Sequence, residues 1–465
     1  MALLERLGNW IWNPWLLFGF LFVGFYYSVR TGFFQIFGFP LWIKATLGSL
    51  FGKKKRGGDH SLTQLQALST ALASTIGTGS IAGVSTAIFY GGPGAIFWMW
   101  VSAFLSTMTG CAEKTLAVRY RRRENGGALL GGPMEYMDRG LHARPLALMF
   151  SLFSVAASLG GGNMVQANSI ATSLEHAFGW SRLAIGIVIS LLTGVVILGG
   201  IGRIGRVSEK LVPAMALFFL AGGGLVLIVH AGEIPRALSE ILRGALVPRA
   251  AIGGGLGYGI SDAMRYGIAR GVFTNEAGLG SSAMAHAAAE VQEPVEEGMW
   301  GLFEVFFATL VVCTTTALVI LVSGVYHPDI ALSAIQRGQV DSSMVGSALS
   351  AAAFSTVLGH WGGPFVALCL LLFAFSSLLG WSYYGERGLS YLTGSSRWTG
   401  HYRVLFLLFI IVGSLGEVGA VWQVADICNG MMALPNLIAL LLLSPEALHL
   451  LSSWTNKQKK KRPAG

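Results

Sequence analysis

Long apolar segments dominate the chain and limit its fold more than any other feature. About eleven of them approach the ~20 apolar residues that a helix needs to cross a bilayer. Their cores are residues 14–29, 64–90, 94–118, 147–176, 183–200, 211–230, 257–288, 299–325, 352–383, 404–415 and 420–443. Charged residues make up 12% of the chain, about half the share in a typical soluble protein, and could not cover a water-exposed surface. The sequence therefore predicts an all-α integral membrane protein.

The basic residues lie mainly on one side of the expected membrane. When the loops are assigned to alternating sides, one side carries 23 Lys and Arg residues and the other carries 6. Cytoplasmic loops hold the basic excess in membrane proteins. We therefore expect an external N-terminus, a cytoplasmic loop at 201–210 and a cytoplasmic C-terminus in the plasma (inner) membrane. The net charge of +9 then requires no nucleic-acid partner.

Two expected spans contain glycine and hydroxyl residues at mid-depth. They read ALASTIGTGSIAGVSTAI (71–88) and YGIARGVFTNEAGLGSSAMAHAAA (266–289). Each opens a set of five spans, and because five is odd the two sets have opposite orientations. This pattern is typical of inverted-repeat transporters with broken helices and a midplane site. The expected units are an extra N-terminal helix with an interfacial segment (1–63), a first repeat (64–256), a second repeat (257–443) and a basic cytoplasmic tail (444–465).

A break in a membrane helix frees backbone groups where bulk water is absent. Amides at a half-helix N-terminus attract an anion such as a carboxylate, and carbonyls at a half-helix C-terminus attract a cation. The same small residues could instead form a packing face between helices. The motifs HExxH, GxSxG and GxxxxGK[ST] do not occur in the sequence, so neither an enzyme of these classes nor an ATP-driven pump is expected.

The chain resembles the alanine or glycine:cation symporter family, also called sodium:alanine symporters. The matching phrases include ALASTIGTGSIAGVSTAIFYGGPGAIFWMW (71–100), GGIGRIGRVSEKLVP (199–213), RGVFTNEAGLGSSAMAHAAA (270–289) and VADICNGMMALPNLIALLLL (424–443). The resemblance implies eleven transmembrane helices, with a leucine-transporter-like core of five plus five inverted helices and one extra N-terminal helix.

The same resemblance implies the transported species. These are small neutral amino acids, alanine or glycine above all, with D-alanine and serine as further candidates, imported with a co-transported sodium ion. The implied partners are this amino acid, sodium and the lipid bilayer; a monomer suffices for transport, and the oligomeric state stays open. A proton-coupled transporter of the same fold remains an alternative, and an ion channel a remote one.

Matching the family's breaks onto this chain implies the site residues. The implied substrate-binding positions are the amides at Thr78 and Gly79, together with Gln166, Phe273, Thr274, Asn275 and Trp381. The implied sodium ligands are the carbonyls of Ala73 and Ile76 and the hydroxyls of Ser376 and Ser377. Each position has a plainer alternative: a packing kink at the break, serines bonded to their own helix, core packing of the aromatic rings, or a structural polar network at Gln166.

The chain departs from the family pattern at two positions. The first break usually reads GxGN, and Ser80 stands in place of the Asn; the eighth span usually carries FxDT, and Ala308 stands in place of the Asp. A hydroxyl is a poorer ligand than a carbonyl or carboxylate oxygen for a hard cation. We therefore expect a second cation site beside Ser80 to be weak or empty.

Ionisable residues beside the second break have two interpretations. Glu276 and His286 could belong to a proton relay. We favour a structural role instead, in which Glu276 pairs with nearby bases and His286 is hydrogen-bonded within a packing face.

Overall fold

The protein is described by a computed structural model that covers residues 6, 8, 10–51, 61–123, 129–246, 259–341 and 344–460. This part of the chain is almost entirely helical. A single short antiparallel pair occurs within it, where β1 (Arg122–Arg123) pairs with β2 (Leu129–Leu130). The expected boundary between repeats at residues 256 and 257 lies outside the described residues.

The N-terminal part begins with one long helix followed by short ones. Helix α2 (Pro14–Arg30) starts with a proline at its first turn, where no helical N–H is lost. Three short elements follow, namely α3 (Phe34–Phe37), α4 (Phe39–Ala45) and the 3-10 segment η1 (Leu47–Phe51). A helix is thus present over the first expected span, residues 14–29, and short helices follow it within the expected N-terminal unit.

The first broken helix starts at a capping box formed by Thr63 and Gln66, which satisfies free amides at both ends of the first turn. Helix α5 (Gln64–Thr75) then stops, and Gly77 adopts an extended conformation. The chain continues through the 3-10 turn η2 (Thr78–Ser80) into α6 (Ala82–Gly91). The expected interruption within 64–90 is therefore present.

The rest of the first half consists of longer helices. Its elements are α7 (Gly94–Arg119), α8 (Pro133–Arg139), α9 (Arg144–Leu159), the π-helical turn η3 (Gly160–Met164), α10 (Val165–Phe178), α11 (Arg182–Ile197), α12 (Gly200–Val229), η4 (Ala231–Glu233) and α13 (Ile234–Leu246).

The second half opens with the second broken helix. Helix α14 (Ile260–Asn275) ends where Glu276 has a left-handed backbone, and Gly278 and Gly280 also have positive φ. Glycine tolerates such angles without steric cost, so the chain unwinds before the short helix α15 (Ala283–Ala287). The elements that follow are α16 (Pro294–Val305), η6 (Phe306–Cys313, π-helical), α17 (Thr314–Val322), α18 (Pro328–Arg337), α19 (Ser347–Leu358), η8 (Gly359–Trp361), α20 (Gly362–Thr393), η9 (Ser396–Trp398), α21 (Thr399–Leu415), α22 (Val418–Leu442) and α23 (Ser444–Lys460).

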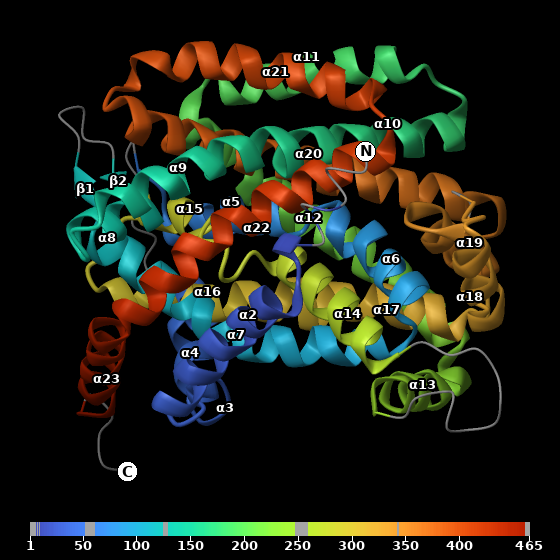
Figure 1. Cartoon of the computed structure of the whole chain (residues 1–465), viewed down its shortest axis with the longest axis horizontal. Coiled ribbons are helices and arrows are strands. Elements are labelled where there is room, and N and C mark those ends of the chain that lie inside the picture. Colours follow the sequence, from blue (N-terminus) through green and yellow to red (C-terminus); the bar gives the residue numbers. More distant parts are fainter. Residues whose placement is uncertain are drawn as a thin grey trace.

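The helices pack so that the first broken helix and the last turn of α14 lie inside the molecule. Helix α5 contacts α12 and α20, whereas α14 contacts α6 and α7. Helices α11 and α21 lie side by side along one edge, at the top of Figure 1. Nearly all residues of α5, η2 and α6 are buried, so the first break is shielded from the surroundings.

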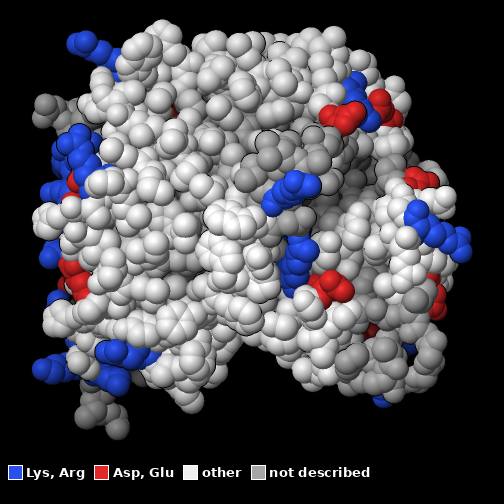
Figure 2. Space-filling model, viewed as in Figure 1, with Lys and Arg blue, Asp and Glu red and all other residues white. Residues whose placement is uncertain are grey.

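Seven helices among the described residues are long and apolar enough to cross a membrane. Many of their large apolar side chains face outward, as expected for contact with lipid. In Figure 2, Lys and Arg gather at the left edge, where Figure 1 places α8, the two strands and α23. The broad region to the right of this edge is mostly uncharged, which agrees with a multi-pass membrane protein.

The structure differs from the sequence-based expectation in two segments. Residues 201–210 were expected to form a loop but belong to α12, and most of the expected tail forms α23. Polar and basic residues disfavour a membrane interior without disfavouring a helix, because Lys, Arg, Glu and Gln have good helix propensity.

Candidate functional site

The two helix breaks touch each other. A Cβ atom built on Gly79 would lie 3.0 Å from the Thr274 hydroxyl oxygen and 3.1 Å from the Phe273 ring. Position 79 therefore has little room for a side chain. The backbone of the first break lies directly against the last turn of α14, as the sequence pattern required for a shared site.

A small enclosed cavity lies where the breaks meet. Its free volume of about 10 Å³ corresponds to about one water molecule. It is lined by Ser74, Thr75, Gly77, Gly79, Gly161, Gln166, Phe273, Glu276, Trp381 and Asn429. Four of the residues implied by the family resemblance, Gly79, Gln166, Phe273 and Trp381, are thus brought to one place. A ligand larger than water requires some of these side chains to move.

Gln166 connects α10 to the first break. Its side-chain oxygen accepts a hydrogen bond from the Thr78 amide at 3.3 Å, and its side-chain nitrogen donates to the Gly161 carbonyl at 3.1 Å. The hydroxyl of Thr78 is buried and has no hydrogen-bond partner in the described structure. The amide of Thr78 lies between two residues that line the cavity, Gly77 and Gly79, and is bonded to Gln166 in this conformation.

The serines of α20 lie at the end of α5. The Ser376 hydroxyl donates to the Ala73 carbonyl at 3.1 Å, and the Ser377 hydroxyl lies 3.0 Å from the same oxygen and 3.1 Å from the Ser74 carbonyl. Ser376 also lies within hydrogen-bond distance of Phe373 on its own helix. Ile76 is fully buried at the C-cap of α5. These oxygens form a compact, buried cluster of the kind that can bind a small cation.

Two other residues implied by the resemblance, Thr274 and Asn275, bond to groups of the protein and do not line the cavity. The Thr274 hydroxyl donates to the Arg270 carbonyl of its own helix. Asn275 caps the second break through the Ala277 amide and donates to the Thr309 hydroxyl. Neither side chain is among the residues that line the cavity.

The two positions that depart from the family pattern lie near each other. Ser80 ends η2, and Ala308 lies in η6, which packs against η2. The hydroxyl of Ser80 is buried and has no hydrogen-bond partner in the described structure, while its carbonyl accepts a hydrogen bond from Thr316 at 2.7 Å. Ala308 is fully buried and offers no side-chain oxygen.

Four side chains in mutual contact form a layer that joins the lining of the cavity to that of a larger vestibule. Phe273 and Trp422 have ring centroids 5.3 Å apart, and the Arg270 guanidinium lies 5.1 Å from the Trp422 ring. Arg270 also forms a salt bridge with Asp426 at 2.9 Å. Phe273 lines the small cavity, whereas Arg270 and Trp422 line a vestibule of about 670 Å³. The layer therefore lies between the small cavity and the vestibule.

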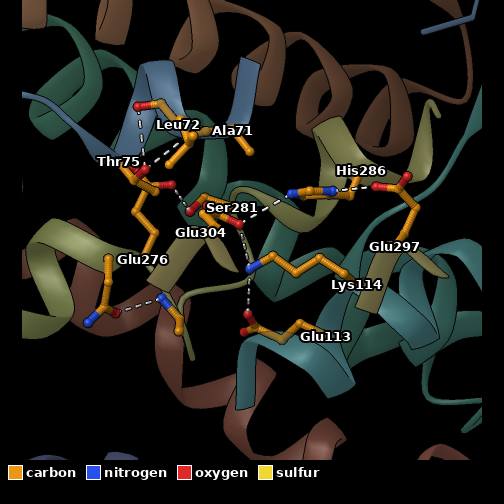
Figure 3. Close-up of polar contacts among 12 residues, drawn as sticks. Ala71, Leu72, Thr75, Glu113, Lys114, Glu276, Ser281, His286, Glu297 and Glu304 are labelled. Atoms are coloured by element: carbon orange, nitrogen blue, oxygen red, sulfur yellow. Dashed lines mark hydrogen bonds and ion pairs between the residues drawn. The ribbon is translucent and has the colours of Figure 1, made fainter. Parts of the chain in front are cut away.

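Charged residues beside the second break form a buried cluster. The Lys114 ammonium lies 3.3 Å from Glu304 and 3.5 Å from Glu113 (Figure 3). His286 bridges Glu297 at 2.6 Å and Glu304 at 3.2 Å. All five side chains are completely buried. His286 is thus hydrogen-bonded within a packing face, as the sequence interpretation favoured.

The sequence interpretation of Glu276 does not fit the structure. No salt bridge to Glu276 is present among the described residues, because Lys114 is engaged by Glu113 and Glu304. Glu276 instead lines the cavity. Asn429 of α22 and Gly161 of the π-helical turn are further lining residues that sequence reasoning missed. The signal for Gly161 was the GGG run at 160–162, and the signal for Asn429 was a polar residue within an apolar span.

Comparison with known proteins agrees with this architecture. The model of the sodium:alanine symporter family matches residues 1–464. The sodium/alanine symporter AgcS of Methanococcus maripaludis is 40% identical over 448 residues, which cover 96% of this chain and 95% of that protein.

Two relatives from Bacillus subtilis carry other names. The probable sodium/glutamine symporter GlnT is 34% identical, covering 97% of this chain and 89% of the relative. The putative sodium/proton-dependent alanine carrier protein YrbD is 33% identical, covering 97% and 91%.

The fold also matches a solved structure. A crystal structure of MhsT in complex with L-phenylalanine superposes with a TM-score of 0.59 at 15% identity, covering 84% of this chain and 90% of that one. At this identity the likeness concerns the fold, which is that of the leucine-transporter-like proteins. The family match over nearly the whole sequence and the relative at 40% identity show that the chain belongs to the sodium:alanine symporter family, whose members are membrane transporters and not enzymes.

Proposed function

We propose that the protein imports a small neutral amino acid, alanine or glycine above all, together with a sodium ion. The observation that carries this proposal is the enclosed cavity lined by both helix breaks. Backbone amides around Thr78 and Gly79 would bind the substrate carboxylate, because a half-helix N-terminus favours negative charge. Phe273 and Trp381 would limit the size of the substrate side chain, which supports alanine over larger amino acids.

Sodium would bind at the end of α5. The hydroxyls of Ser376 and Ser377 lie at hydrogen-bond distance from the Ala73 carbonyl, and oxygen clusters of this type suit a hard cation. Ile76 would contribute a further carbonyl. A second cation beside Ser80 would bind weakly or not at all, because Ala308 supplies no oxygen.

The layer formed by Phe273, Trp422, Arg270 and Asp426 would act as one gate of this transporter. Alternating access requires that the path to each side of the membrane closes in turn. The basic asymmetry of the loops supports an external N-terminus and a cytoplasmic C-terminus in the plasma (inner) membrane. With this orientation, α6 ends outside and the vestibule faces the exterior.

Proteoliposomes test the proposal. Labelled alanine should accumulate when sodium is present outside and absent inside, and unlabelled glycine should compete with it. Accumulation driven by an inward sodium gradient supports the proposed function. Uptake of neither amino acid under any gradient would contradict it.

Proton coupling is the second candidate. It is favoured by one observation, the buried carboxylates of Glu297 and Glu304 that contact the two ring nitrogens of His286. One relative is named a putative sodium/proton-dependent alanine carrier. Sodium-free accumulation that follows an inward pH gradient would decide for this alternative.

A further inference from the structure

Glu276 is the charged residue among those that line the small cavity. Glu276 is only 2% exposed. It is placed there by the break itself: Glu276 caps α14 with a left-handed backbone, and its amide still donates to the Val272 carbonyl. Non-glycine residues rarely adopt this conformation, and such strained positions cluster at functional sites.

Three side chains with hydrogen-bond donors lie around the carboxylate of Glu276. The Trp381 indole donates to one carboxylate oxygen at 3.0 Å, and the Ser281 hydroxyl donates to the other at 2.5 Å. The Ser74 hydroxyl lies 3.4 Å from that second oxygen. All three partners are neutral. A buried carboxylate is costly when no cation accompanies it, and no described residue forms a salt bridge with this one.

A second, independent oxygen faces the same cavity. Asn429 is 2% exposed and lines the cavity, and its side-chain oxygen has no hydrogen-bond partner in the described structure. It comes from α22, which is unconnected in sequence to the break that holds Glu276. An unpartnered buried acceptor requires an explanation, and a ligand that donates hydrogen bonds provides one.

The lining of the cavity therefore includes two chemically different kinds of group, which we treat as its two ends. The first break contributes backbone amides, which favour negative charge; that of Thr78 is bonded to Gln166 and would exchange this partner for the substrate carboxylate. Glu276 and Asn429 supply oxygen acceptors, one of them charged. A zwitterion with one carboxylate and one ammonium group matches both ends. A neutral solute or a simple carboxylic acid matches one end at most.

We propose that the Glu276 carboxylate, assisted by the side-chain oxygen of Asn429, binds the α-ammonium group of the substrate and makes that group a requirement for binding. This inference rests on the proposed function and names a determinant within the same site. It goes beyond size selection, because it predicts rejection of molecules as small as alanine that lack the positive charge.

Equilibrium binding of labelled alanine to the purified full-length protein tests this inference. Glu276→Gln keeps the size of the side chain and removes its charge. Loss of a charge-assisted hydrogen bond should weaken alanine binding about 10- to 100-fold. Sodium binding measured without alanine should change less than about threefold. Asn429→Ala removes a neutral acceptor and should weaken alanine binding less than Glu276→Gln does.

Glu113→Gln is the matched control. Glu113 is fully buried in the same region and accepts hydrogen bonds from the Gly278 amide and from Asn436, but it does not line the cavity. Its variant should bind alanine as the wild type does. An equal loss in both variants would assign Glu276 a structural role and overturn the inference.

A measurement on the unmodified protein covers the case in which Glu276→Gln does not fold. Propionate and N-acetylalanine, at 100-fold excess over alanine, should not displace labelled alanine, whereas glycine should. Displacement by propionate would overturn the inference, since that molecule has no ammonium group.

The remaining outcomes separate the inference from the proposed function. Unchanged alanine binding by Glu276→Gln refutes the inference alone and identifies a carboxyl group that holds its own proton. Loss of sodium binding without alanine would assign Glu276 to the cation instead. A wild-type protein that binds neither alanine nor glycine refutes the proposed function, and the inference with it.

Discussion

Ser377→Ala removes one hydroxyl from the proposed sodium site. That hydroxyl lies 3.0 Å from the Ala73 carbonyl oxygen and 3.1 Å from that of Ser74, in a region without exposed surface. A polar contact to a charged group contributes about 1.5–3 kcal/mol, and we apply this range to the contact between the Ser377 hydroxyl and the sodium ion. Because 1.4 kcal/mol corresponds to a tenfold change in affinity, the sodium concentration for half-maximal uptake should rise about 10- to 150-fold.

Ser80→Ala provides the informative comparison. The Ser80 hydroxyl has no hydrogen-bond partner in the described structure, so its removal should raise this sodium concentration less than about threefold. Ser382→Ala is the matched control. It removes another buried hydroxyl of α20, and this hydroxyl donates to the Leu379 carbonyl of the same helix. It should behave as the wild type.

The assay is alanine uptake into proteoliposomes at varied sodium, with choline maintaining ionic strength. With a single working cation site, the sodium dependence should have a Hill slope near one. A slope near two, combined with greater damage from Ser80→Ala than from Ser377→Ala, would refute the reasoning.

Three further predictions concern the pocket and the orientation. Gly79→Ala places a Cβ 3.0 Å from Thr274 and 3.1 Å from Phe273 and should weaken alanine binding tenfold or more. Gly224→Ala is the control, because a Cβ at that position has nothing within 4 Å, and it should leave alanine binding unchanged. Equal alanine affinity in both variants would contradict the proposed carboxylate site. Alanine or glycine should outcompete leucine by about tenfold or more in uptake, because extra methylenes in a packed site typically cost 1–3 kcal/mol. Equal competition by leucine would contradict the proposed limit on side-chain size. A reporter fused to the C-terminus should be active in the cytoplasm, and activity only outside would overturn the orientation.

Local sequence signals were sufficient to predict the two helix breaks. Glycine at Gly77 and Gly79 removes the side chains that packing cannot accommodate, and Gly278 and Gly280 allow backbone angles that other residues disfavour. The apolar runs likewise indicated the long helices. These features depend on residues close together in the sequence, so the pattern alone reveals them.

The surroundings of Glu276 could not be predicted in the same way. The sequence places bases near it, but Lys114 pairs with Glu113 and Glu304 because α7 and α16 pack together. Asn429 reaches the cavity only because α22 packs against the π-helical turn η3. Such pairings depend on how distant helices meet, and composition or periodicity within one segment contains no information about that.

Equilibrium binding of alanine to the purified protein, measured with and without sodium, tests the central claim most directly. If both ligands bind at the adjoining breaks, sodium should tighten alanine binding, and alanine should tighten sodium binding by the same factor. The predicted result is an alanine Kd at least about fivefold lower in sodium than in choline. An identical alanine Kd in the two salts would contradict the account.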